Sequence, residues 1–302
     1  MKLLVVGSLA IDTVETPFGK AENSLGGAAT YISLTASYFN KNVQVVGVVG
    51  DDFPKYGYDL FKKRKINTKG IEIVKGGKTF RWGGKYHKNM NDRDSLFTEL
   101  NVFENFSPKI PKEFVKTEFV CVGNIEPSLQ MDVINQIKKP KFIVGDTMNF
   151  WITGKKENLI KTIKKLDLFF INDSEAKLIA ENDNLITCGK KILTMGPKYV
   201  VIKKGEHGAM LFSKNKIFTV GALPLENIVD PTGAGDCFAG GFIGHISKTG
   251  DISFKNLKRA VLYGSVMASF CVEEFSIDGV KKLTFKKIQA RYKTLKEISR
   301  VD

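Results

Sequence analysis

The feature of this sequence that most constrains its fold is the alternation of short apolar runs with segments of helical periodicity. This order is typical of β-α-β units, in which parallel strands form a central sheet and helices cover both of its faces. We predict strands of that sheet at residues 3–6, 43–49, 119–122, 142–144, 168–171 and 199–202. We predict helices between them at residues 28–39, 56–64, 128–137, 157–164 and 174–180.

Residues 75–105 break this alternation. They are polar, contain two Gly-Gly turn signals and lack a long helical stripe. We predict that they form an inserted hairpin or small sheet and that, together with residues 12–23, they make a lid over the edge of the main sheet. Such a lid matters where a reaction must exclude water. We therefore expect residues 1–302 to form one α/β domain that carries a small β lid.

Length and composition exclude several classes of protein. A chain of 302 residues with 43% hydrophobic and 26% charged residues is long enough to bury a large core and is not expected to be disordered. The longest apolar run near the start is interrupted by Gly7 and Ser8 and ends at Asp12, so it is too short to cross a bilayer. We expect a soluble cytoplasmic protein without a membrane partner.

The formal net charge of +14 raises the question of a nucleic-acid partner. The lysines are spread along the whole chain, and their densest group, at residues 281–296, surrounds an apolar stripe with helical spacing. That stripe consists of Phe285, Ile288, Tyr292 and Leu295. This pattern favours the solvated side of a packed helix, so we expect no nucleic-acid partner. The positive field would speed the encounter with anionic nucleotides.

The cysteines and histidines show no spacing typical of metal ligands. They are Cys121, Cys188, Cys237, Cys271, His87, His207 and His245. None of the cysteines forms a Cys-x-x-Cys pair, so neither a zinc site nor a disulfide framework is indicated.

Residues 230–236, which read Asp-Pro-Thr-Gly-Ala-Gly-Asp, carry the most specific chemistry. A run of small and apolar residues follows, as expected for a buried helix. The first turn of a helix has unpaired N–H groups and partial positive charge, and the sequence Gly-Ala-Gly there lets a phosphate approach closely. Asp236 would then lie beside the phosphate, where it could accept the proton of an attacking hydroxyl. Taken alone, the same residues are also compatible with a plain turn and a helix-start acid.

Residues 230–241 fit the C-terminal signature of the ribokinase-like (pfkB) family of carbohydrate and nucleoside kinases, and the chain resembles that family over nearly its whole length. The resemblance implies a three-layer α/β/α fold with a mostly parallel central sheet and a small β lid. It also implies an ATP-dependent kinase that transfers the γ-phosphate to a hydroxyl of a small sugar, with Mg²⁺ and K⁺ as further cofactors. The P-loop sequence Gly-x-x-x-x-Gly-Lys-Ser/Thr is absent, as is the Gly-x-Gly-x-x-Gly of dinucleotide-binding dehydrogenases.

The resemblance assigns roles within this signature. Asp236 is implied as the general base, and the backbone of Gly233, Ala234 and Gly235 as the anion hole. Within the same signature, Asp230 and Thr232 are implied to help line a site for a monovalent cation.

The N-terminal part of the resemblance concerns the phosphate acceptor. Asp12, at the end of the first strand region, and the pair Gly26-Gly27 are implied to bind it. Many relatives have Asn at the position of Ala10, and sugar kinases typically have Asn at that of Tyr31. The acceptor therefore stays open: a sugar is the main hypothesis, and an adenosine-type nucleoside kinase or a non-catalytic sugar- or nucleotide-binding protein are the alternatives.

Further positions complete the predicted site. Asn172 and Glu175 match the family's Asn-x-x-Glu motif, whose glutamate orients Mg²⁺ through water, although the same spacing also fits a helix capping box. Arg81, in the predicted lid, is a candidate for contact with the acceptor or the product phosphate. The candidates for the nucleotide side are Lys203, Gly205, Gly208 and Ser265. Asp146 and Asn149 end a strand and are predicted to support the site. Lids of this family often mediate dimers, so a homodimer through the lid is a further expectation.

Overall fold

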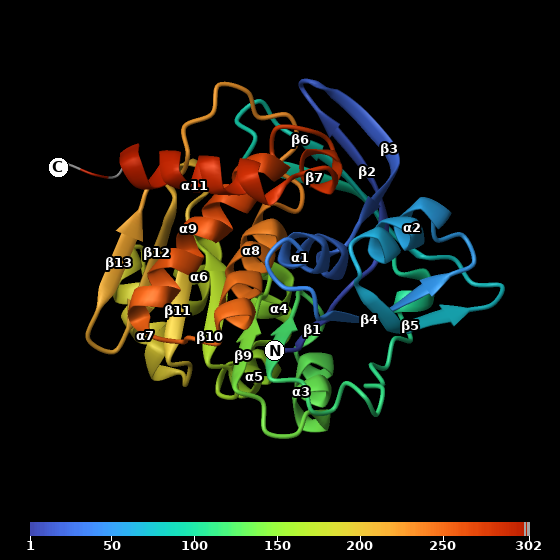
Figure 1. The fold of residues 1–302 in the computed structure, drawn as a ribbon, viewed down its shortest axis with the longest axis horizontal. Helices are drawn as coiled ribbons and strands as arrows, with labels where there is room; N and C mark the ends of the chain where they lie inside the picture. The colour runs from blue at the N-terminus through green and yellow to red at the C-terminus, as the bar shows by residue number, and fades with distance from the viewer. Residues whose placement is uncertain (299, 301–302) are drawn as a thin grey trace.

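A mostly parallel sheet runs through the centre of the molecule (Figure 1). The computed structural model describes residues 1–298 and 300, and in this part of the chain nine strands form the sheet in the order β13-β12-β11-β10-β9-β8-β1-β4-β5. The strands are β1 (Leu3–Val6), β4 (Val43–Gly50), β5 (Asn67–Val74), β8 (Phe119–Val122), β9 (Phe142–Gly145), β10 (Leu168–Asn172), β11 (Tyr199–Lys203), β12 (Ala209–Ser213) and β13 (Ile217–Val220). Only the pairings of β11 with β12 and of β12 with β13 are antiparallel.

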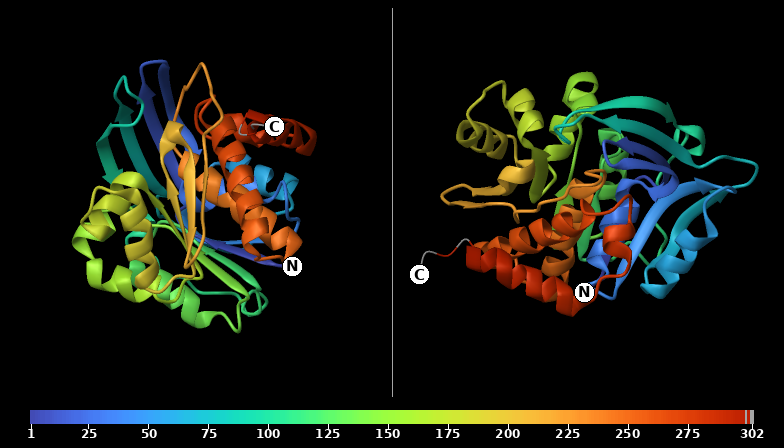
Figure 2. Two further views of the ribbon diagram at one scale, coloured as in Figure 1. Left: turned by 90° about the vertical axis from the view of Figure 1, so that its left-hand side faces the viewer. Right: turned by 90° about the horizontal axis from the view of Figure 1, so that it is seen from above.

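Helices cover both faces of this sheet, as the left view of Figure 2 shows. One face packs against α1 (Ala28–Ala36), α2 (Lys55–Lys63), α8 (Ala234–Thr249), α9 (Phe254–Cys271), α10 (Asp278–Lys281) and α11 (Phe285–Ile298). The other packs against α3 (Pro127–Gln136), α4 (Asn149–Gly154), α5 (Lys156–Ile163), α6 (Asp173–Ala180) and α7 (Leu185–Thr194). This is the predicted three-layer α/β/α fold.

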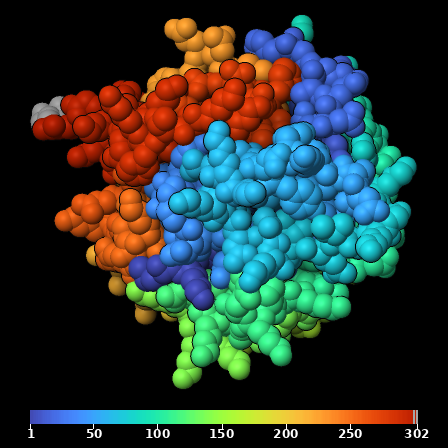
Figure 3. Space-filling model, turned by 45° about the vertical axis from the view of Figure 1, so that its right-hand side comes forward, coloured from blue at the N-terminus to red at the C-terminus, as the bar shows by residue number. Residues whose placement is uncertain are grey.

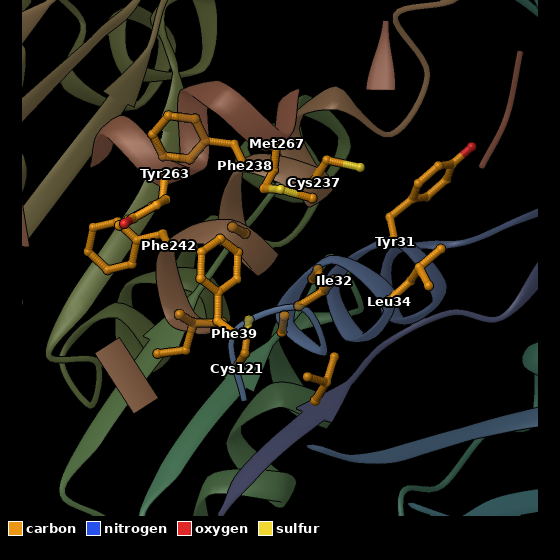
Figure 4. Close-up of a cluster of buried hydrophobic side chains, with 14 of the residues drawn as sticks. Tyr31, Ile32, Leu34, Phe39, Cys121, Cys237, Phe238, Phe242, Tyr263 and Met267 are labelled. Carbon is orange, nitrogen blue, oxygen red and sulfur yellow. The ribbon is translucent and has the colours of Figure 1, made fainter. Parts of the chain in front are cut away.

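The sequence of β1 explains why it lies in the middle of the sheet. Successive side chains of a strand point to opposite faces. Leu3 and Val5 accordingly enter one core and Leu4 and Val6 the other, and all four are fully buried. Figure 4 shows the first of these cores, which contains Phe39, in the turn after α1, and Phe242 of α8. A strand that is apolar at every position can be satisfied only between two layers of helices.

The lid is a second, four-stranded sheet in the order β3-β2-β6-β7. Its strands are β2 (Ala10–Thr16), β3 (Gly19–Gly26), β6 (Phe80–Tyr86) and β7 (Arg93–Glu99), so the small β lid of the predicted fold is present. Because β2 follows β1 after only three residues, the lid rises from the carboxyl edge of the main sheet. The space-filling view shows the C-terminal region (red) beside the lid strands β2 and β3 (blue) (Figure 3). Leu96 and Phe18 are exposed on the lid; the homodimer through the lid stays a prediction.

The sequence missed three strands of the main sheet, and all lie at its edges. β5 is an edge strand whose first half is polar and whose apolar residues are interrupted by Glu72, and its Ile73 is 54% exposed. β12 and β13 form an antiparallel hairpin at the opposite edge, outside the β-α-β alternation on which the prediction rested. Among the described helices, none combines the length and apolar character that a membrane span requires.

Candidate active site

The start of α8 lies at the carboxyl edge of the sheet, beneath the lid. Gly233 caps this helix in the left-handed conformation, with φ of 76°. A Cβ at this position would lie 2.5 Å from the ring of Tyr31. Glycine is therefore required both by the backbone angle and by the close ring contact. The N–H groups of Gly233 and Gly235 make no backbone hydrogen bond among the described residues and can bind an anion, whereas that of Ala234 donates to the carbonyl oxygen of Pro231 over 3.1 Å.

Lys203, at the end of β11, brings a positive charge to the same helix start. Its Nζ lies 3.1 Å from the position that a Cβ of Gly235 would occupy, so a larger residue there would crowd the ammonium group. Its side chain is only 16% exposed, and Nζ donates a hydrogen bond of 2.9 Å to Oδ2 of Asp146. The helix N-terminus and the ammonium group together form a site for an anion.

Asp236 lies in the first turn of α8 and faces this positive region. Burial, followed by repulsion from Asp146, raises the pKa of its carboxyl from 3.8 to about 7, against the lowering influence of Lys203 and Arg93. A carboxylate whose pKa lies near neutral pH is suited to accept a proton in a reaction at that pH. The structure thus brings together the predicted base and the predicted anion hole.

Glu175 joins the same group of charges from α6. Its Oε2 accepts a hydrogen bond of 2.9 Å from the N–H of Asn172, and its own N–H donates one of 2.8 Å to Oδ1 of Asn172, so the capping box is present. Burial and the charge of Asp146 raise the pKa of Glu175 to about 7. The capping box therefore uses Oε2 of Glu175, and the same carboxylate also interacts electrostatically with Asp146 and Lys203.

The charges of this cluster do not balance. Burial alone would lower the pKa of Lys203, yet the neighbouring carboxylates, with Asp146 first, hold it above its ordinary value. One ammonium group thus faces the carboxylates of Asp146, Glu175 and Asp236. Within the described residues, no group of three His, Cys, Asp or Glu side chains has the arrangement of a metal cage. Mg²⁺ keeps several waters and binds phosphate oxygens, so it needs only one or two carboxylates, and Glu175 fits that requirement.

Asp12 marks a second part of the site, on β2 of the lid. Burial, followed by the charges of Asp230 and Asp236, raises its pKa to about 8, while the N–H of Gly27 donates to it. A Cβ on Gly26 would lie 1.9 Å from Oδ2 of Asp12. The Gly-Gly pair is therefore needed for the chain to pass directly beside this carboxylate.

Asp230 is fully buried below the lid. Its Oδ1 accepts a hydrogen bond of 2.8 Å from the N–H of Thr232, and its Oδ2 accepts one of 2.9 Å from the N–H of Ser276. Burial raises its pKa. Within the described chain no Lys, Arg or His forms an ion pair with it, and a bound cation would supply the missing charge. Thr232 also reaches the lid, because its Oγ1 donates to the hydroxyl of Tyr86 over 3.3 Å.

Tyr31, the residue that departs from the sugar-kinase pattern, lies between these parts. It is 2% exposed, its ring lies against Gly233, and burial raises its pKa well above the ordinary value, with further contributions from Asp12 and Asp230. Figure 4 shows its ring on α1 directed away from the aromatic cluster around Phe242. An aromatic ring thus lies between Gly233 and the carboxylates of Asp12 and Asp230, at the position where the resemblance led us to expect Asn in a sugar kinase.

Other predicted residues lie further from Asp236. Arg81 pairs with Asp52 over 3.1 Å and donates to Asn23 over 2.8 Å. Asp12 pairs with Trp82 across the lid sheet, so the neighbouring Arg81 projects from the opposite face and is not brought to Asp12.

On the nucleotide side, Gly205 and Gly208 border the turn η2 (Gly205–His207), and both have positive φ. Ser265 is buried within α9.

Sequence reasoning missed two residues that face the carboxylates. Arg93, at the start of β7, lowers the pKa of both Asp236 and Glu175. Tyr86 links the lid to Thr232. Neither stands in a motif, and only the pairing of β6 with β7 places them over the site.

A hollow of ≈ 400 Å³ lies elsewhere, beside β5. Its lining includes Val48, Glu72, Asn101 and Phe106. It contains none of the carboxylates whose pKa values are raised, and it lies at the edge of the main sheet. The charged cluster under the lid, rather than this hollow, is the candidate active site.

An anion site at a helix start, a buried lysine and a carboxylate of near-neutral pKa, set at the carboxyl edge of a parallel sheet under a β lid, define a phosphotransferase that acts on an alcohol group. The family described as pfkB family carbohydrate kinase matches residues 1–280, and the chain belongs to this ribokinase-like family of ATP-dependent kinases.

Three proteins illustrate the similarity. The chain is 28% identical over 253 residues to the cytidine kinase of Thermococcus kodakarensis. This alignment covers 82% of the present chain and 89% of the cytidine kinase. The crystal structure of Methanocaldococcus jannaschii nucleoside kinase has a TM-score of 0.78 at 20% identity and covers 97% of this chain and 99% of that chain. A Vibrio cholerae fructokinase double mutant, bound to fructose, ADP and a potassium ion, has a TM-score of 0.80 at 16% identity and covers 97% and 98% of the two chains.

Proposed function

We propose that this protein is an ATP-dependent nucleoside kinase in which Asp236 deprotonates the attacking hydroxyl. The observation that carries the proposal is the position of Asp236, whose carboxyl has a pKa of about 7 and lies one residue beyond the Gly233–Gly235 turn and near Lys203. The sequence alone favoured a sugar as acceptor. The similarity to a cytidine kinase over most of the chain favours the nucleoside alternative.

Two aromatic side chains near Asp12, one on α1 and one on the lid, support a nucleoside. Tyr31 places an aromatic ring where sugar kinases typically have an amide. Trp82 is the cross-strand partner of Asp12, so its indole lies on the lid face that carries the acceptor-binding carboxylate. Asp12 would bind ribose hydroxyls while the indole offers a surface on which a base can stack, an interaction worth about 1–3 kcal/mol per base.

The proposed reaction assigns one task to each group. The N–H groups of Gly233 and Gly235 and the ammonium of Lys203 bind the phosphates and stabilise charge that develops during transfer; the N–H of Ala234 is held by the carbonyl oxygen of Pro231. Asp236 takes the proton of the primary hydroxyl as its oxygen attacks the γ-phosphorus. Glu175 would hold Mg²⁺ through water, and that ion would neutralise phosphate charge. Asp230 and Thr232 would hold a monovalent cation; the absence of an ion-pair partner for Asp230 within the described chain supports this.

A substrate panel tests the proposal. We would measure ATP consumption with cytidine, uridine, adenosine, inosine, ribose and fructose as acceptors, in the presence of Mg²⁺ and with or without K⁺. The expected result is a kcat/KM for at least one nucleoside that exceeds that for every free sugar, and the activity should rise with K⁺. Identification of the product as the nucleoside 5′-monophosphate would confirm the acceptor. A free sugar that outperforms all nucleosides would refute the proposal, as would nucleoside binding without turnover.

A further inference from the structure

Arg93 occupies an unusual place in the lid. Its Cζ lies 5.5 Å from the ring centroid of Trp82 and 5.9 Å from that of Tyr86. Trp82 is paired with Asp12, on the proposed acceptor side, and Tyr86 contacts Thr232, which precedes the anion-binding turn. These neighbours place the guanidinium group over the region between acceptor and phosphates.

The turn that joins β6 to β7 extends this arrangement to the nucleotide side. Nδ2 of Asn91 donates a hydrogen bond of 3.2 Å to Oε1 of Glu206, and Oδ1 of Asn91 lies 3.6 Å from the position that a Cβ of Gly205 would occupy. The lid hairpin therefore spans from Asp12 to η2. Arg93 stands between these two contacts, where the acceptor hydroxyl and the terminal phosphate must meet.

The charge of Arg93 is directed at the carboxylates of the main domain. It lowers the pKa of Asp236 and of Glu175, so its field reaches both groups. Within the described chain no carboxylate lies within ion-pair distance of its guanidinium group, whereas Arg291 is paired with Glu273 at 2.7 Å. An arginine without an ion pair, held over a reaction centre, is available to a phosphate.

We propose that Arg93 is a catalytic residue that binds the transferring phosphoryl group from the lid side. The proposal rests on the kinase function proposed above. The new bond joins the acceptor oxygen to the γ-phosphorus, the bond between that phosphorus and the bridging oxygen of ADP breaks, and the acceptor proton passes to Asp236. Negative charge on the equatorial oxygens lies between the N–H groups of the Gly233–Gly235 turn below and the guanidinium group of Arg93 above. The lid thus completes the charge-stabilising site when it closes over the bound phosphates.

The kinetic test compares Arg93→Gln with the wild type and with Lys85→Gln. Lys85 lies in the same lid and pairs with Glu15 on the surface, so it controls for loss of one lid charge. An arginine that stabilises a phosphoryl-transfer transition state is worth about 10³–10⁵ in kcat. We expect kcat of Arg93→Gln to fall on the order of 10³-fold with little change in either KM, and the Lys85 variant to stay near the wild type.

Two further readouts separate catalysis from a structural role. Arg93→Ala should regain activity when guanidinium ion is added at millimolar concentration. A variant whose lid is misfolded would not be rescued in this way. In a plot of kcat against pH, the acidic limb of Arg93→Lys should lie close to that of the wild type. The acidic limb of Arg93→Gln should move to higher pH, because this variant loses the positive charge that lowers the pKa of Asp236.

The outcomes distinguish the two proposals. An active wild type together with an Arg93→Gln variant within about threefold of its kcat would overturn the role of Arg93 alone. A rise in acceptor KM without loss of kcat would also overturn it, because it would indicate acceptor binding only. A wild type that phosphorylates sugars instead of nucleosides would refute the proposed acceptor, and the Arg93 experiments could then be run with the sugar.

Discussion

Replacement of Asp236 by asparagine should stop phosphoryl transfer and, at the same time, stabilise the fold above neutral pH. Asparagine has nearly the same shape but cannot accept the proton of the acceptor. General-base catalysis contributes typically 10²–10⁴-fold, so kcat should fall by about that factor. ATP affinity should not fall, because the variant keeps the helix start and Lys203 and loses a negative charge beside the phosphates.

The expected gain in stability follows from the raised pKa. Burial and Asp146 move the pKa of Asp236 from 3.8 to about 7. Because each tenfold change in acidity is worth about 1.4 kcal/mol, the ionised carboxylate costs the folded protein at most about 4 kcal/mol. Between these two pKa values the folded state binds more protons than the unfolded state, so the stability of the wild type falls as pH rises. The cost is complete above pH 7 and absent below 3.8.

The assay combines turnover with unfolding. Urea unfolding of the wild type and of Asp236→Asn should be compared at pH 5 and pH 8, alongside steady-state kinetics at pH 8. We expect the variant to be more stable than the wild type by about 2–4 kcal/mol at pH 8 and by less at pH 5. Asp183→Asn, at an exposed aspartate between α6 and α7, is the matched control and should change neither quantity.

Two results would refute this reasoning. A variant that keeps its kcat within about tenfold would show that another group, or water, accepts the proton. A stability difference that is the same at pH 5 and pH 8 would show that the carboxyl of Asp236 is not held at a raised pKa. Either outcome would also remove the main support for the proposed function, since that support is the position and protonation of this residue.

Two further predictions concern the same centre. Gly233→Ala should destabilise the fold by at least about 1–2 kcal/mol, because φ of 76° disfavours a side chain and the added Cβ would meet the ring of Tyr31. Urea unfolding checks this, and Gly221→Ala, where an added Cβ meets nothing within 4 Å, should cost far less. Glu175→Gln keeps the capping geometry but loses a charge. In a metal titration, the Mg²⁺ concentration that gives half the maximal rate should therefore rise roughly 10–100-fold. An unchanged metal dependence would exclude a role of Glu175 in Mg²⁺ binding.

Local sequence was sufficient for the parts of the site that lie close together in the chain. The glycine turn, the helix that follows and Asp236 occupy one short segment, so the need for unpaired N–H groups beside a base can be recognised there. The capping box of Asn172 and Glu175 is local in the same way. The central strands of the sheet were also predictable, since a strand buried on both faces must be apolar throughout.

The remaining parts depend on contacts between distant segments. Lys203 and Asp146 are 57 residues apart, and they meet because they follow parallel strands that end at the same edge of the sheet. Arg93 and Asp236 are further apart in the chain, and the charge of Arg93 reaches Asp236 only because β7 pairs with β6 above that edge. The sequence around Arg93 is polar and resembles an ordinary exposed hairpin, so no local pattern indicated its orientation.

The charges of this centre indicate that closure of the lid and binding of the proposed cations are coupled. With no substrate bound, the acidic groups of this centre outnumber its two basic groups, Lys203 and Arg93. The acidic groups are Asp12, Asp146, Glu175, Asp230 and Asp236, and burial has raised the pKa values of several of them. A nucleotide adds further negative charge, and burial without compensation would be costly. Cations beside Glu175 and Asp230 would offset that cost on the side of the main domain, and Arg93 would do so from the lid. Closure of the lid and neutralisation of the phosphates are therefore expected to depend on each other.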